Sequence, residues 1–241
     1  MHLNPAVQST TNGCISEGDK PSGIGKGLEA RVCPPNNSPL PEPPSGFRDG
    51  AATSLLQEAP SAPIRVYVGI DGGSSGAVAA VDETGAWQVA LVAAVQERGH
   101  WLLSVDQNLE FLRLAVAKAG GLDNVLVAYE QSRKNPMFGS KNNFVNGRNE
   151  EFWRVLLTVK GFRHCSVDPK TWQSVCLKGI NSTDTKVRAR EYIRRMCPET
   201  TWLDCYNKAP REAIVDAMCI ALWCKASYHD LAADHCDSIE P

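Results

Sequence analysis

The sequence lacks the features that would place the chain in a membrane or in a disulfide-stabilised class. No run of about eighteen apolar residues occurs in its 241 residues, so we expect no membrane contact through a transmembrane helix. The nine cysteines are odd in number and form no C-x-x-C pair, which argues against a disulfide framework and a structural zinc site. The cysteines are therefore predicted to be reduced and mostly engaged in packing.

Residues 1–63 have little apolar periodicity. They are dominated by Pro, Ser, Asn and Gly, as in "CPPNNSPLPEPPSG", and cannot bury enough surface to offset the entropy of ordering. The first sixteen residues contain no Asp or Glu and several Ser and Thr, but they also lack Arg and an apolar core segment, so a targeting peptide and an unstructured tail both stay open. We expect a disordered or targeting extension at 1–63, one domain at 64–227 and a flexible tail at 228–241.

The net charge of −2 hides a strong asymmetry along the chain. Between Gln131 and Arg211 lie 16 of the 25 basic residues, against seven acidic residues. A solvated helical surface is one explanation of this excess. The interleaving of aromatic residues with the basic ones favours a second explanation, a surface that binds a polyanion such as nucleic acid. The aromatic residues concerned are Trp153, Trp172, Tyr192 and Trp202.

The order of apolar patterns predicts a mixed α/β sheet without internal repeats. Strands are expected at 66–71, 76–81 and 86–94, joined by short turns as an antiparallel meander, with further strands at 124–131 and 163–169. Helices are expected at 104–119, 149–160, 170–178, 183–196 and 211–226. Three antiparallel strands followed by strands that alternate with helices give a sheet covered on both faces, which is the order of the ribonuclease H-like fold.

Two local signals refine these helices. The spacing of Phe152, Val155, Leu156 and Val159 predicts the helix at 149–160, and Ser182 is the expected N-cap of the helix at 183–196. In that second helix Lys186, Arg190 and Arg194 fall every four residues and form one basic stripe.

Acidic residues interrupt apolar elements at three places. Asp71 ends the first strand, Glu130 ends the "VLVAYE" strand, and Glu212 and Asp216 lie four apart in the last helix, on one helical face. Asp71 as a turn carboxylate and Glu212 as a first-turn acid favoured by the helix dipole are open alternatives. Glu130 and Asp216 resist such explanations, because an unpaired charge in apolar surroundings is costly.

Carboxylates packed together repel one another and raise each other's pKa unless a cation lies between them. Hard oxygen ligands favour Mg²⁺ or Mn²⁺ over zinc. Two such ions about 3.5 to 4 Å apart can activate a water and stabilise the leaving oxygen of a phosphodiester. The four acids together therefore predict a two-metal site for phosphodiester hydrolysis.

At these residues the sequence resembles the RuvC-type Holliday junction resolvases of the ribonuclease H-like superfamily. "GIDGGSSGAVA", "VAYEQ" and "EAIVDAMCIALW" are similar to the first-strand, second-strand and final-helix motifs of that group. "VAYEQSRKNPMFGSKNNF", "VDPKTWQ" and "APREAIVDAMCIALW" most resemble the chloroplast resolvases of plants and green algae. The resemblance covers roughly residues 64 to 227 and implies that Asp71, Glu130, Glu212 and Asp216 are the catalytic metal ligands. Bacterial members place the third acid, or a histidine, where this chain has Ala213.

The resemblance also implies a partner and a location. It implies a homodimer on four-way junction DNA, a magnesium-dependent endonuclease activity and a chloroplast location. Two symmetric nicks need two active sites related by a twofold axis, which agrees with a homodimer. The segment "SRKNPMFGSKNNFVNGR" after Glu130 is the expected contact with the junction centre, with Phe138 either stacked on an unpaired base or part of a small loop core.

The residues expected to bind DNA fall into two groups. The first group, in the segment after Glu130, contains Arg133, Lys134, Phe138, Lys141 and Arg148. The second group lies in the following helices and is expected to position backbone phosphates without sequence choice. It contains Lys170, Lys186, Arg188, Arg190 and Arg194, and either Lys170 or Lys186 is a further candidate to support the scissile phosphate.

Two other functions stay open from the sequence. An ATP-binding protein of the sugar-kinase or actin type also ends its first strand in a small-residue loop such as "DGGSSG". Such a protein needs a second domain and a second glycine-rich phosphate loop. After residue 85 the only similar segment in the sequence is "AGG" at 119–121. Gly72 and Gly73 are therefore expected to leave room beside Asp71 and to hold no nucleotide cofactor. In a catalytically inactive DNA-binding protein, the four acidic residues would have no function.

The extension generates the first prediction. Removal of residues 1–60 is expected to leave DNA cleavage in vitro unchanged, because the segment carries no core pattern. The measurement compares the cleavage rate of the truncated and full chains on a synthetic four-way junction. A soluble, folded truncation that no longer cleaves would contradict the prediction.

Overall fold

The central sheet of the computed structural model has the mixed composition predicted from the sequence, three antiparallel strands followed by parallel strands. The structure describes residues 31–32, 64–132 and 139–236, with side chains described in 64–132 and 139–228. Strands β2 (Val66–Asp71), β3 (Ala77–Asp82) and β4 (Trp87–Leu91) form the antiparallel meander. On the other side of β2, β7 (Val125–Glu130) and β8 (Arg163–Val167) run parallel to it, giving the order β4-β3-β2-β7-β8. The ribonuclease H-like prediction is confirmed.

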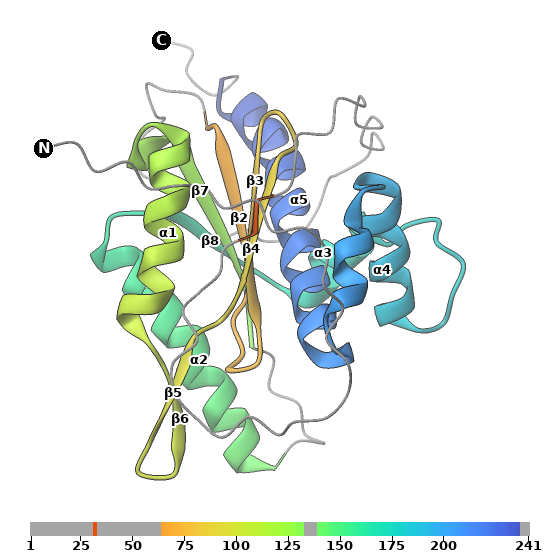
Figure 1. Ribbon diagram of the computed structural model, residues 1–241. Coiled ribbons are helices and arrows are strands. Elements are labelled where there is room, and N and C mark those ends of the chain that lie inside the picture. The colour runs from red at the N-terminus through yellow and green to blue at the C-terminus, as the bar shows by residue number, and fades with distance from the viewer. Residues whose placement is uncertain (1–30, 33–63, 133–138, 237–241) are drawn as a thin grey trace, which may run out of the picture.

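Helices cover both faces of this sheet (Figure 1). On one face α1 (Val105–Ala119) and α2 (Ser140–Val159) pack in a cluster with Val68 and Ile70 of β2. On the other face α3 (Pro169–Cys176), α4 (Thr185–Met196) and α5 (Lys208–Cys236) pack around a second cluster. The 3-10 turns η1 (Leu122–Asn124) and η2 (Thr200–Cys205) complete the connections. In the part of the chain that the structure describes, no helix is long and apolar enough to span a membrane.

Several elements differ from the sequence prediction. Strands β5 (Ala94–Glu97) and β6 (His100–Leu103) form a hairpin where none was expected. A two-residue strand, β1 (Arg31–Val32), pairs with β4 inside the segment predicted to be an unstructured extension. The edge of β4 offers unpaired backbone groups to any extended segment, which explains how so short a strand can form.

Three helix boundaries also differ. Helix α2 begins at Ser140, nine residues before the expected start, so much of the predicted junction-contact segment is helical. Helix α4 is capped by Asp184, whose carboxylate accepts hydrogen bonds from Lys186 N and Val187 N, and the predicted cap Ser182 instead accepts from Asp184 N. Helix α5 continues to Cys236, into the segment predicted to be a flexible tail.

The burial of several side chains corrects the sequence interpretation. Trp153 and Trp172 are fully buried core residues, so they do not belong to an exposed polyanion-binding face. Of the four apolar side chains that predicted helix α2, Leu156 is buried and Phe152 partly buried, whereas Val155 and Val159 are exposed. The six cysteines whose side chains are described form no disulfide, and four of them are buried, as expected for packing cysteines.

Strand β2 and helix α5 touch backbone to backbone at Gly69. A Cβ atom built on Gly69 would lie 2.2 Å from the carbonyl oxygen of Ala217 and 2.3 Å from the amide nitrogen of Ala221. No side chain fits at these distances, so glycine is what allows the helix to lie directly on the strand. This contact fixes the position of α5 relative to the end of β2.

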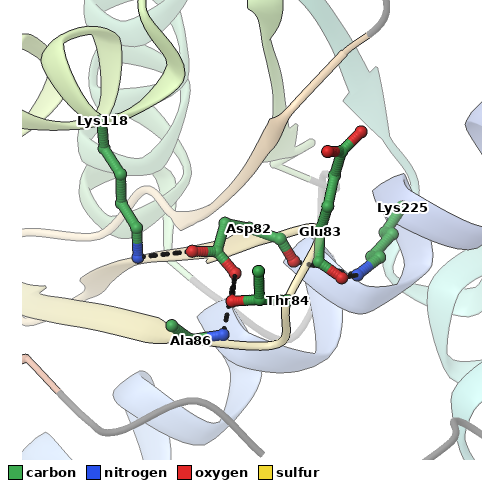
Figure 2. A network of polar contacts seen from close by, with 6 residues as sticks. All are labelled: Asp82, Glu83, Thr84, Ala86, Lys118 and Lys225. Atoms are coloured by element: carbon green, nitrogen blue, oxygen red, sulfur yellow. Dashed lines mark hydrogen bonds and ion pairs between the residues drawn. The ribbon is translucent and has the colours of Figure 1, made fainter. Parts of the chain in front are cut away.

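The turn between β3 and β4 is tied to helices on both faces of the sheet (Figure 2). The Asp82 carboxylate accepts from Thr84 Oγ1 and Ala86 N at 2.7 and 2.9 Å, and it lies 2.8 Å from Lys118 Nζ of α1. From the other face, Lys225 Nζ of α5 donates to the backbone oxygens of Asp82 and Glu83 at 2.9 and 3.3 Å. The two lysines therefore clamp the turn between α1 and α5.

The contact at Gly69 generates the second prediction. Gly69→Ala is expected to destabilise the protein by about 3 kcal/mol or more, because the added methyl group must push β2 and α5 apart. Gly147→Ala is the matched control, since nothing lies within 4 Å of its Cβ position. Within helix α2 that control is expected to gain about 0.5 to 1 kcal/mol. Chemical unfolding measures both, and equal stabilities of the two variants would contradict the prediction.

Candidate active site

Asp71 and Glu130 lie at the carboxyl ends of two neighbouring parallel strands. Ile70 of β2 is paired with Tyr129 of β7, so the residues that follow them, Asp71 and Glu130, end the two strands side by side. Side chains alternate along a strand. Tyr67 and Leu126, an even number of positions earlier, both belong to the core beneath α5. Both carboxylates therefore project toward the α5 face of the sheet.

Asp216 reaches the same place from α5. Its side chain is buried, with 7% exposure, inside a stretch in which residues 213–224 are otherwise apolar and buried. It lies one residue before Ala217, whose carbonyl oxygen approaches Gly69 of β2. The glycine contact thus brings the helix carboxylate to the end of the strand that carries Asp71.

The three carboxylates act on one another electrostatically. Burial raises the pKa of Asp71 to about 6, with the charge of Asp216 adding to the rise, while Lys186 and a hydrogen bond from the Gly73 backbone oppose it. Burial raises the pKa of Glu130 to about 8, and the charges of Asp71 and Asp216 contribute. Burial also raises the pKa of Asp216, against the opposing effect of Lys186. Three separate elements therefore hold acids that are costly to ionise together.

Lys186 is the cation that the fold places among these acids. Its ammonium group forms an ion pair and hydrogen bond with Asp216 Oδ2. Burial alone would lower the pKa of Lys186, but Asp216, Asp71 and Glu212 outweigh that effect and raise it. Lys186 was predicted to bind phosphate, and in the structure it is the counter-ion of Asp216.

Glu212 and Asp168 lie at the edge of this cluster. Glu212 is one helical turn before Asp216, is partly exposed and adds to the rise in the pKa of Asp216. Asp168 follows β8, next to the end of β7, and its charge contributes to the rise in the pKa of Glu130. Asp168 was not predicted as part of the site, because its position before Pro169 is typical of a helix cap. It also fills that role, since its carboxylate accepts from Lys170 N at 2.8 Å.

The loop after Asp71 is a tight turn packed against the helix on the opposite face. Gly76 N donates to Gly73 O at 2.9 Å, and a Cβ atom on Gly76 would lie 1.9 Å from the backbone oxygen of Asp71. Trp153 Nε1 of α2 donates to Gly72 O at 3.3 Å, and the indole lies within contact distance of Gly72. The glycines therefore allow a close turn beside Asp71, and Trp153 holds it.

The candidate ligands suit a divalent cation by their chemistry. All are carboxylates, the donors that Mg²⁺ and Mn²⁺ prefer, and their mutual repulsion is relieved by positive charge. Within the described residues, no three or more acidic, histidine or cysteine side chains already stand close enough to hold one ion together. Asp216 is engaged by Lys186 instead. An ion at this site therefore has to compete with Lys186 for Asp216.

The predicted DNA-binding residues are spread over several surfaces. Arg133, Lys134 and Phe138 lie outside the described residues. Arg148 of α2 donates to Trp101 O of β6 at 2.6 Å, and Arg188 of α4 donates to Leu177 O at 2.5 Å. The remaining candidates are exposed or partly exposed on α2, α3 and α4. They are Lys141, Lys170, Arg190 and Arg194.

Comparison with known proteins gave matches only among solved structures. No protein-family model matches the chain, and no curated protein does. Thermus thermophilus RuvC in complex with a Holliday junction substrate is similar with a TM-score of 0.41 and 14% identity, over 68% of this chain and 95% of that one. A second T. thermophilus RuvC structure has a TM-score of 0.38 and 15% identity, over 69% and 96% of the two chains. Because these TM-scores and identities are low, the evidence for function comes from the side chains of this chain.

The raised pKa values generate the third prediction. When a chelator removes divalent metal, Glu130 in the folded protein has a pKa of about 8 and stays largely protonated below that pH. In the unfolded chain the same carboxyl group has its ordinary pKa of 4.5. Between these values the folded state binds more protons than the unfolded state, so the free energy of unfolding falls as the pH rises. The slope is at most about 1.4 kcal/mol per pH unit for each proton.

Urea unfolding at a series of pH values from 5 to about 8 measures this slope. Glu130→Gln is expected to flatten it, and Asp71→Asn to flatten it only in the lower part, up to about pH 6. Glu110→Gln, at an exposed position of α1, is the matched control and is expected to keep the slope. An unchanged slope in Glu130→Gln would show that this carboxyl group does not bind the proton.

Proposed function

We propose that this chain is a metal-dependent endonuclease that resolves four-way DNA junctions by paired, symmetric nicks. The observation that carries the proposal is the convergence of Asp71, Glu130 and Asp216. These acids come from two strands and a helix, each interrupts an apolar element, and each has a raised pKa. Such a cluster weakens the fold unless it serves a cation, because buried like charges are costly.

The residues of the chain have distinct parts in this proposal. Asp71, Glu130 and Asp216 would hold the metal ions, with Glu212 completing the set from the preceding turn of α5. When bound, Mg²⁺ or Mn²⁺ would supply an activated water and charge neutralisation at the leaving oxygen of the phosphodiester. Lys186, once released from Asp216, is free to contact a phosphate oxygen at the same place. The turn at 72–76 carries only small side chains beside Asp71, where the DNA backbone would lie.

The surroundings of the cluster support a nucleic-acid substrate. Helix α4 starts at the site with Lys186 and carries Arg190 and Arg194 along the same stripe, four and eight residues further on. Arginines on a helix position phosphates and add affinity without sequence choice. Two nicks of opposite strands need two such sites, so the proposed active form is a homodimer. The plastid location implied by the resemblance remains a prediction.

An ATP-binding protein of the actin or sugar-kinase type is less well supported. In such a protein the turn after the first strand embraces phosphate, whereas here Trp153 and the Asp71 backbone pack against Gly72 and Gly76. An inactive DNA-binding protein would keep the basic helices but would gain nothing from a buried acidic cluster.

The fourth prediction tests the nuclease directly. The full chain is expected to nick a synthetic four-way junction in Mg²⁺ and not in chelator, at symmetric positions on two opposed strands. Asp71→Asn, Glu130→Gln and Asp216→Asn are each expected to lower the nicking rate by at least about 10²-fold, because each removes a ligand of the charge-stabilising centre. Junction affinity, measured in Ca²⁺ by gel shift, is expected to persist in all three variants.

Glu110→Gln is the control for an exposed carboxyl group on α1, which packs on the other face of the sheet, and it is expected to nick normally. Nucleotide turnover without nicking would favour the kinase-like function. Binding without cleavage in any divalent metal would favour the inactive DNA-binding protein. A parallel loss of affinity and cleavage in Glu130→Gln would assign that residue to the fold.

A further inference from the structure

Cys165 and Cys224 belong to elements that are far apart in the chain and packed together in the fold. Cys165 lies in the middle of β8, and Cys224 lies in α5. Cys224 is a buried member of the cluster beneath α5, with 2% exposure. Cys165 is partly exposed and packs against that same cluster. One thiol is therefore open to solvent from one side, and the other is covered by the core.

The pairing of the strands places Cys165 in the row of the sheet that α5 approaches most directly. Cys165 is paired with Ala128 of β7, and Ala128 is paired with Gly69 of β2. Gly69 lies against the backbone of α5 at Ala221, one helical turn before Cys224. The three residues of this row all have small side chains, so the helix lies close to the sheet here.

A neighbouring contact fixes the register between β8 and α5. The Arg163 guanidinium lies over the Tyr228 ring, 5.6 Å from its centroid. Helix α5 runs opposite to β2, and hence to β8, since Tyr228 also lies beside Tyr67 near the start of β2. A step of two residues along β8 covers about 6.6 Å, and one turn back along α5 covers about 6 Å. The contact of Arg163 with Tyr228 is therefore followed by one of Cys165 with Cys224.

The two thiol groups are hydrogen-bonded to each other. This hydrogen bond lowers the pKa of Cys165, and together with burial it raises the pKa of Cys224. Cys224 therefore donates the hydrogen bond, and the Cys165 sulfur is the one that ionises first. Reactive thiolates are partly exposed and lie near a cation, and the positive charge of Arg163 acts on this pair.

We infer that Cys165 and Cys224 form a reversible redox site, at which a small-molecule disulfide oxidises the two thiols to a disulfide that joins β8 to α5. The Cys165 thiolate attacks one sulfur of the oxidant, forms a mixed disulfide and releases one thiolate. The Cys224 thiol then loses its proton and attacks the Cys165 sulfur, which forms the protein disulfide and releases the second thiolate. Two protein thiols are oxidised, and one external disulfide is reduced to two thiols.

The other close pair of described cysteines lacks these properties. The Cys176 thiol donates to the backbone oxygen of Cys219 at 3.5 Å. Burial raises the pKa of Cys176 to about 12 and that of Cys219 well above its ordinary value, so both stay protonated. The inference therefore selects one pair. It goes beyond the proposed nuclease function and does not depend on it.

Oxidation of the folded full chain with oxidised glutathione tests the site. Samples are quenched in acid at a series of times, digested and mapped by mass spectrometry, which assigns each of the nine cysteines to a thiol, a mixed disulfide or a protein disulfide. We expect a linked Cys165–Cys224 peptide that disappears in dithiothreitol. Because a cross-link restricts the unfolded chain, we also expect the oxidised protein to unfold at a higher urea concentration than the reduced protein.

Three variants separate the roles of the two thiols. Cys224→Ala is expected to leave Cys165 as a mixed disulfide with glutathione, because the thiol that would displace glutathione is absent. Cys165→Ser is expected to leave the buried Cys224 a thiol and to remove the shift in urea. Cys205→Ser is the matched control, since Cys205 is an exposed cysteine outside the pair, and it is expected to form the link at the unaltered rate. Circular dichroism verifies that each variant is folded.

Absence of the Cys165–Cys224 peptide from the oxidised folded chain overturns the inference. So does a link that forms only in urea, because the fold would then not bring the two sulfurs together. A folded Cys224→Ala variant whose Cys165 stays a thiol also overturns it. If Cys224→Ala does not fold, Cys165→Ser decides, and a Cys224 that is still oxidised in that variant refutes the assigned order of attack. None of these measurements uses DNA cleavage, so their outcome is separate from that of the proposed function.

Discussion

The site depends on the direct contact between the backbones of β2 and α5. Gly69 has no side chain, so the helix lies on the strand with the Ala217 carbonyl and the Ala221 amide against it. Asp216, next to Ala217, is thereby held at the end of the strand that carries Asp71. Glu130 joins them because β7 is paired in register with β2. The backbone contacts hold the three carboxylates close together, although the carboxylates repel one another.

The sequence predicts this part of the structure well because each signal is local. Period-2 patterns locate β2, β3 and β7, and an acid in an apolar element stands out without any knowledge of its neighbours. Lys186 and Asp168 could not be assigned in this way. Lys186 looks like one more member of a basic stripe, and only the packing of α4 on α5 brings its ammonium group to Asp216, 30 positions further along the chain. The metal and catalytic assignments of the four acids remain predictions.

The largest errors lie around helix α2, where local and tertiary signals conflict. "SKNNFVNGRN" has the polar, glycine-containing composition of a loop, yet it forms the first half of the helix, held to Ser132 by Asn146 and Glu150. The aromatic residues interleaved with basic ones predicted a polyanion-binding face, but Trp153 and Trp172 are core residues. Apolar spacing likewise suggests that Val155 and Val159 are buried within the chain. A spacing pattern reports an apolar face and not what covers it.

Lys186 changes how the acidic cluster relates to folding. Many metal-binding sites leave their ligands mutually repelling until the ion arrives, so that folding and loading occur together. Here a side chain of the same molecule already supplies one positive charge to Asp216. The internal counter-ion offsets part of the repulsion among the buried acids without a metal ion. A divalent ion bound here would therefore replace a charge that the folded chain already supplies, and folding would not have to wait for the ion.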